Sequence, residues 1–178
     1  GRGGELVLSA GTSSQESGGR LSVRSGVSAG KVSGALLLRT ASSPLSGDLI
    51  LSTGVATSGD SGAMWIGSGG STSGVSGDIK IAVGTGNSGL GGELLLSGGK
   101  TISTTGTSGG RVSVITGVGR KTSGALLLLT ANAGSSGVSG QLVLSTGTAS
   151  LGNSGALYIG SGDAKSGRGG AVYVSVGS

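Results

Sequence analysis

The chain has 178 residues, of which 43 are Gly and 11% are charged, and its formal net charge is +5. It contains no His and no Cys, which excludes disulfide bonds and removes two of the side chains most used in acid–base, nucleophilic and metal chemistry. No apolar run approaches the ~18 residues of a membrane-spanning helix, so no membrane span is predicted. A composition this rich in Gly is typical of a flexible linker, and only the internal pattern argues against that interpretation.

Twelve short segments with one pattern follow one another along the chain, and we call each of them a rung. A rung starts with Gly, has an apolar residue two and four positions later, and usually has Gly again seven positions later. Because the apolar residues recur at every second position, each rung is predicted to be a β-strand with one inward, apolar face. The starting glycines are Gly4, Gly19, Gly34, Gly47, Gly62, Gly77, Gly92, Gly110, Gly124, Gly140, Gly155 and Gly170.

Small residues dominate the two ends of each rung. The starting Gly has the same parity as the inward apolar residues, which predicts a close approach of backbone or a tight corner at that point. Six positions after the starting Gly, eight of the twelve residues are Ser or Thr, whose hydroxyls suit hydrogen bonds to turn backbone. The connecting segments are rich in Gly, Ser, Thr and Asn, as turns require.

The order of the rungs itself repeats with a second, longer period. The sequence GELVL at Gly4 returns as GELLL at Gly92, and the rungs that follow repeat in the same order. The chain is therefore predicted to be a single repeat array over residues 1–178, made of two six-rung super-repeats at approximately 4–91 and 92–178.

An isolated rung has one apolar face and nothing to bury it against. Stacking rungs about 4.8 Å apart in a ladder would bury that face. The sequence thus predicts an all-β fold, a β-solenoid of twelve rungs of about 15 residues, with one, two or three rungs per turn all compatible with the pattern. No polar cap is evident at either end, so we expect a segment of a longer array or a unit that stacks on copies of itself.

Large apolar residues also stand between the two inward positions of many rungs, where the side chain should face water. Exposed apolar patches mark interfaces, which predicts lateral packing against other copies. The candidate packing residues are Val7, Leu37, Ile50, Trp65, Leu95, Leu127, Val143 and Tyr158.

Catalysis is not expected, and no catalytic, metal-binding or cofactor-binding residue is predicted. The seven acids are interpreted as solvated carboxylates, because a hydrolase would need two of them converging in a cleft. The GxGxxG match at 84–89 is followed by a strand pattern where a dinucleotide site needs a helix. The twelve basic residues are scattered and aromatics are few, so nucleic acid is not an expected partner, whereas an anionic polysaccharide fits the positive charge.

The Gly-x-Leu-x-Leu rungs and the Ser-Gly turns resemble Gly/Ser-rich β-solenoid repeats of the parallel β-helix type, found in extracellular fibres, adhesins and surface appendages. The resemblance covers the whole chain and implies a structural or adhesive role, outside the cell or at its surface, without an active site. We therefore expect a segment of a self-associating extracellular filament. The alternatives are an adhesin or carbohydrate-binding stalk that uses Trp65 and Tyr158, and a solenoid polysaccharide hydrolase.

Overall fold

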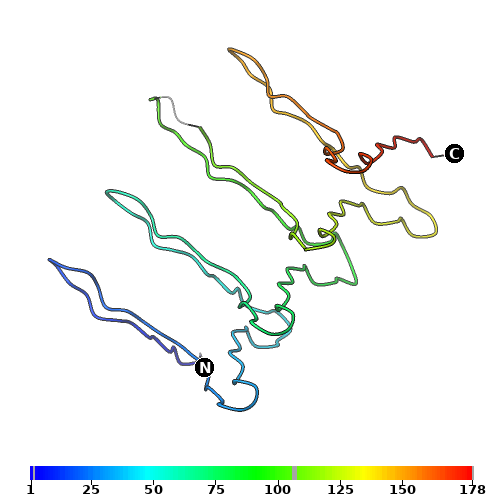
Figure 1. The fold of residues 1–178 in the computed structure, drawn as a ribbon. Coiled ribbons are helices and arrows are strands. Elements are labelled where there is room, and N and C mark those ends of the chain that lie inside the picture. Colours follow the sequence, from blue (N-terminus) through cyan, green and yellow to red (C-terminus); the bar gives the residue numbers. More distant parts are fainter. Residues whose placement is uncertain (2, 106–107, 178) are drawn as a thin grey trace. The chain divides into compact units, whose positions relative to one another are not determined.

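A computed structural model describes residues 1, 3–105 and 108–177 of the chain (Figure 1). Within these ranges there is no α-helix and no β-strand, so no element bounds can be given. No helix in the described part is long and apolar enough to cross a membrane. The chain divides into two compact units, Gly1–Ala82 and Val83–Ser178, and each is considered by itself.

The predicted β-solenoid is wrong, and with it the predicted all-β fold. A β-ladder needs the N–H and C=O groups of neighbouring rungs to pair repeatedly, at about 2.9 Å between N and O. The four backbone–backbone hydrogen bonds in the described part instead join the two ends of single loops, as from Gly19 N to Gly11 O at 2.8 Å. Apolar alternation favours an extended rung, but the rungs do not pair into a sheet.

Each unit makes two long excursions, and each excursion consists of an outward rung, a tip loop and a return rung (Figure 1). A third rung follows every return rung, and the first three of these third rungs lead to the next excursion. The outward rungs are residues 4–10, 47–53, 92–98 and 140–146; the return rungs are 19–25, 62–68, 110–116 and 155–161; the third rungs are 34–40, 77–83, 124–130 and 170–176. The rungs thus recur in threes in the structure.

Most loops between rungs are closed at their necks, where the starting Gly of one rung lies against the end of the rung before it. Gly110 N donates to Gly99 O at 2.8 Å, and a Cβ built on Gly110 would lie 2.7 Å from Gly99 N. At Gly62 a Cβ would meet the side chain of Thr53 at 3.7 Å, which is ordinary contact, and at Gly47 it would meet no atom within 4 Å. The close approach expected at the starting glycines is therefore present at some loop necks, such as that of Gly110, and absent at others.

Two kinds of loop occur, and in most loops the residue three positions before the next rung distinguishes them. In five of the six loops where that residue is Gly, φ is positive, as at Gly59 with +102°, a left-handed conformation that costs Gly little, and Gly137 is the exception. Where it is Glu16, a positive φ would be strained, and Glu16 N instead donates to Ser13 Oγ at 2.9 Å. Lys31 N donates to Ser28 Oγ at 3.1 Å in the same way. Left-handed glycines also occur at Gly74, Gly89, Gly152 and Gly167.

The described residues form no buried core. The chain exposes 18309 Å² of surface. A globular protein of 16.5 kDa exposes about 7,600 Å², and the fully unfolded chain about 24,000 Å². In the part that the structure describes, only Ala10, Gly98 and Thr116 are even partly covered, and all three lie six positions after a starting Gly, beside a loop neck. The necks are therefore the most tightly packed points of the chain.

Candidate interaction surface

The eight residues predicted to pack laterally fall on all three kinds of rung. Val7, Ile50, Leu95 and Val143 lie on the four outward rungs, Trp65 and Tyr158 on return rungs, and Leu37 and Leu127 on third rungs. Their exposed fractions run from 68% to 92%, so the structure leaves all of them open to a partner. This exposure does not by itself single them out, because the inward residues are exposed as well.

Exposure alternates along most rungs. The first inward position is exposed by 50% to 59% in eleven rungs, with Leu6 at 83% in the first rung. Where a large apolar residue follows, it is more open in every rung but the first, as at Ile50 with 79% against 56% for Leu49. An extended backbone produces this alternation, since successive side chains point to opposite sides. Rungs with a large apolar residue at this outer position therefore present two apolar faces, and neither is buried, whereas Ser22, Lys80 and Ser113 stand there in three other rungs.

Two excursions bring candidate residues to matching positions. Ile50 and Trp65 each lie three residues from the neck formed by Thr53 and Gly62. Val143 and Tyr158 stand in the same relation to the neck formed by Thr146 and Gly155. In both pairs one tip loop joins the outward rung to the return rung (Figure 1). All four side chains remain exposed, so neither pair covers itself.

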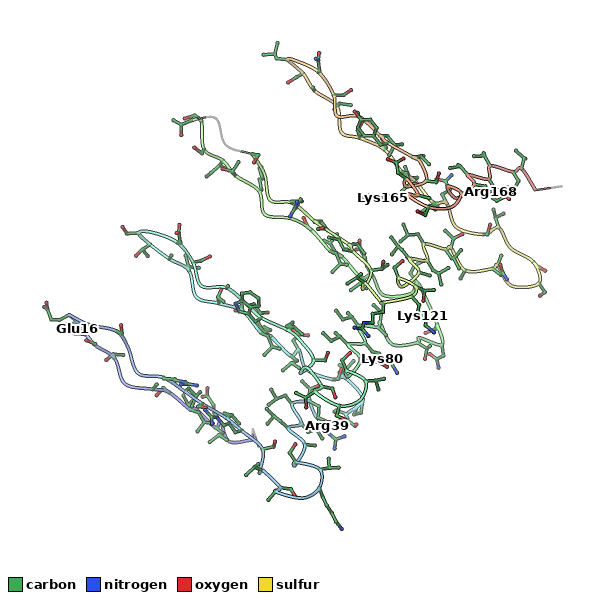
Figure 2. All side chains as sticks on the ribbon, in the orientation of Figure 1. Glu16, Arg39, Lys80, Lys121, Lys165 and Arg168 are labelled. Atoms are coloured by element: carbon green, nitrogen blue, oxygen red, sulfur yellow. The ribbon has the colours of Figure 1, made fainter. Side chains whose placement is uncertain are left out.

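Charges are almost unpaired in the part of the chain that the structure describes. The single ion pair there joins Lys80 Nζ to Asp78 Oδ2 at 3.8 Å, on a third rung. Figure 2 places Glu16 at the tip of its excursion, whereas Arg39 and Lys80 of the same unit lie at the opposite end. The described residues line no pocket and hold no group of three potential metal ligands.

The signs of the charges follow the three kinds of rung, a pattern that the sequence analysis missed. Outward rungs carry acids and no bases: Glu5, Asp48 and Glu93. Return rungs and the loops after them carry eight bases and one acid, Asp163. The bases are Arg20, Arg24, Lys31, Arg111, Arg120, Lys121, Lys165 and Arg168. Sorting the charges by every third rung would have revealed this from the sequence.

Comparison with protein families, with curated proteins and with solved structures found no match to this chain.

Proposed function

We propose that the chain is a non-enzymatic structural protein that self-associates into an extended assembly through its repeated apolar rungs. The observation behind this proposal is the uncovered surface, which exceeds that of a globular protein of the same mass by about 10,700 Å². Ordering 178 residues costs on the order of 200 kcal/mol, which burial of apolar surface must offset. The chain alone does not bury enough, so neighbouring copies are needed to stabilise it.

The amount of uncovered surface also favours many neighbours over one. A protein–protein interface of ordinary size covers about 800 Å² on each partner. A single such contact would leave most of the excess surface of this chain in water. Because the exposed apolar positions recur in every rung, each copy offers equivalent contacts along its whole length. An extended assembly satisfies these contacts, whereas a closed dimer does not.

The finer parts of the proposal rest on the sequence. We propose that copies associate end to end and laterally, because the same rung pattern runs from one end of the chain to the other. The absence of His and Cys supports a role without catalysis. The resemblance to repeats of extracellular fibres supports a location outside the cell or at its surface.

Assembly and gain of structure should occur together, which gives a direct test. Light scattering and amide hydrogen exchange are followed on the same samples across a concentration series. We expect little amide protection in dilute samples and protected rung amides above a critical concentration. A chain that stays monomeric at every concentration, or that assembles without any gain of protection, would overturn the proposal.

A second candidate function is carbohydrate binding at exposed aromatic rings. Trp65 and Tyr158 stand on equivalent return rungs and are each 92% exposed, which leaves both ring faces free to stack on a sugar. Titration of the dilute chain with soluble oligosaccharides in a calorimeter tests this function. A saturable heat of binding that Trp65→Ala with Tyr158→Ala removes would support it, and the absence of any heat of binding would rule it out for the sugars used.

A further inference from the structure

The arrangement of rungs in excursions allows the distribution of charged residues among the rungs to be interpreted. An outward rung and the following return rung leave and rejoin the base of one excursion, and in the first and third excursions they carry opposite signs. In the first excursion the outward rung holds Glu5, and the return rung holds Arg20 and Arg24. None of these three forms an ion pair with a described residue. Both charged faces are thus available to something outside the chain.

The outward rungs present a uniform composite face. Each has an aliphatic residue at its third position after the starting Gly, and three of the four have a carboxylate two residues earlier. Ile50 with Asp48 and Leu95 with Glu93 are examples, and both aliphatic side chains are more than 70% exposed. A partner for this face must offer apolar surface flanked by cations, because an unpaired charge loses its solvation when it is covered.

The return rungs offer the two parts of that complement on different rungs, cations on two of them and apolar surface on the other two. Arg111 stands one position after its starting Gly, and the loops that follow return rungs add further cations, including Lys121, Lys165 and Arg168 in the second unit. Figure 2 shows these three side chains away from the excursion tips. Trp65 and Tyr158 supply apolar surface on the other two return rungs.

We infer that the outward rungs of one copy dock on the return rungs of a second copy, with acid facing base. This inference rests on the proposed self-association and specifies the faces that meet. The contact is heterologous, because different faces of the two copies are used, and a heterologous contact that does not close adds copies without limit. Opposite charges across it set the register of copies and disfavour contacts between like faces.

A second copy fits these faces better than a polyanion does. An anionic polysaccharide would neutralise the cations of the return rungs but would be repelled by Glu5, Asp48 and Glu93. It would also leave the aliphatic residues of the outward rungs uncovered. The chain itself carries both signs on separate rungs, so one type of contact between copies covers both faces.

Charge reversal with mixing tests the inference in the full chain. An acid-reversed variant carries Glu5→Lys, Asp48→Lys and Glu93→Lys, and a base-reversed variant carries Arg20→Glu, Arg24→Glu and Arg111→Glu. We expect each variant alone to need a critical concentration about tenfold higher than the natural chain, because like charges then face each other. An equimolar mixture should recover assembly, since reversed acids meet reversed bases.

A matched control separates this contact from the effect of net charge. The control carries Asp60→Lys, Asp78→Lys, Ser42→Lys and Ser136→Lys, which raises the net charge as much as the acid-reversed variant does while leaving the outward rungs, the return rungs and the loops after the return rungs intact. We expect it to assemble like the natural chain. Equal loss in the control, or unimpaired assembly of either reversed variant, would overturn the inference while the proposed self-association stands.

Two further measurements complete the experiment: assembly of the natural chain, and binding of a polyanion to the base-reversed variant. If the natural chain does not assemble at all, the proposed function fails as well as this inference. If base reversal abolishes binding of dextran sulfate but leaves self-association unchanged, the return rungs serve a polyanion, and the pairing between copies is wrong.

Discussion

The outward and return rungs are built on the same inward pattern and differ in what they present on the other side. Inward, both have an apolar residue two and four positions after the starting Gly. On the other side, the outward rungs carry Val7, Ile50, Leu95 and Val143, the first three with an acid two residues earlier, and the return rungs carry Ser22, Trp65, Ser113 and Tyr158, of which the two serines have an Arg two residues earlier. The inward pattern keeps each rung extended, and the opposite face distinguishes one rung from the next.

This difference suggests how a repetitive chain chooses among its many similar contacts. Twelve rungs with the same inward residues offer numerous nearly equivalent pairings, and apolar contact alone discriminates poorly among them. Opposite charges on alternate rungs penalise contacts between rungs of the same kind. The apolar residues should therefore supply most of the free energy of assembly, and the charges should supply its selectivity.

The largest effect is expected when the aliphatic residues of the outward face are removed. Ile50→Ser and Leu95→Ser together should raise the critical concentration about a hundredfold, which corresponds to about 3 kcal/mol of lost apolar burial. Leu90 and Leu151 lie in loops and are almost fully exposed, so Leu90→Ser with Leu151→Ser is the matched control. Equal effects from the two pairs, measured by light scattering, would show that outward rungs have no special role.

Salt should affect assembly less strongly and through the charges alone. Raising NaCl from about 0.05 to 0.5 M shortens the screening length to a few ångströms and should weaken assembly by up to about tenfold. A chain with Glu5→Gln, Asp48→Asn and Glu93→Gln should show a flatter dependence. If salt instead promotes assembly of the natural chain, apolar contacts dominate the free energy of assembly. The difference in charge between outward and return rungs then has little effect on assembly.

Substitutions in the tip loops, which join outward to return rungs, should have a smaller effect on the critical concentration. Gly59 and Gly152 adopt φ of +102° and +107°, so Gly59→Ala or Gly152→Ala should cost about 1 kcal/mol each, a fivefold rise in critical concentration. Gly30→Ala is the control, because Gly30 has no positive φ and a Cβ there would meet no atom within 4 Å. If none of the three substitutions changes the critical concentration, the conformation of the tip loops does not influence how the rungs assemble.

Local features of this chain could be predicted from its sequence. Alternation at Leu49 and Leu51 predicted a β-strand, which the structure does not form, but the alternating exposure that it implied is present, since Ile50 is more open than either neighbour. The parity of Gly110 correctly indicated a close backbone approach. Both depend on residues within one rung or one loop, where sequence separation is short.

The predicted pairing of rungs failed for a physical reason. A ladder needs specific long-range partners, and every rung here has several neighbours with the same pattern, so alternation specifies an extended chain without specifying its partner. The predicted packing residues, such as Ile50 and Trp65, are exposed, as are the inward residues beside them. The distribution of acids and bases among the rungs was not predicted, because the predicted period was six rungs, whereas the charges follow a period of three rungs.

The smallest predicted effect concerns the first tip loop, which closes without a left-handed Gly. Ser13 Oγ accepts hydrogen bonds from Glu16 N at 2.9 Å and Gln15 N at 3.3 Å, and Gly19 N donates to Gly11 O across the neck. Because these groups are exposed to water, Ser13→Ala should raise the critical concentration at most about twofold, with faster amide exchange at residue 16.

Glu16→Gly should make that loop independent of Ser13. A Gly at this position can adopt the positive φ that Gly59 has in the next tip loop, and the hydroxyl of Ser13 is then not needed to hold the turn. We therefore expect Ser13→Ala to change nothing further when Glu16→Gly is already present. NMR coupling constants at residue 16 report the sign of φ directly. A negative φ in Glu16→Gly, or an undiminished effect of Ser13→Ala, would show that another residue selects the loop type.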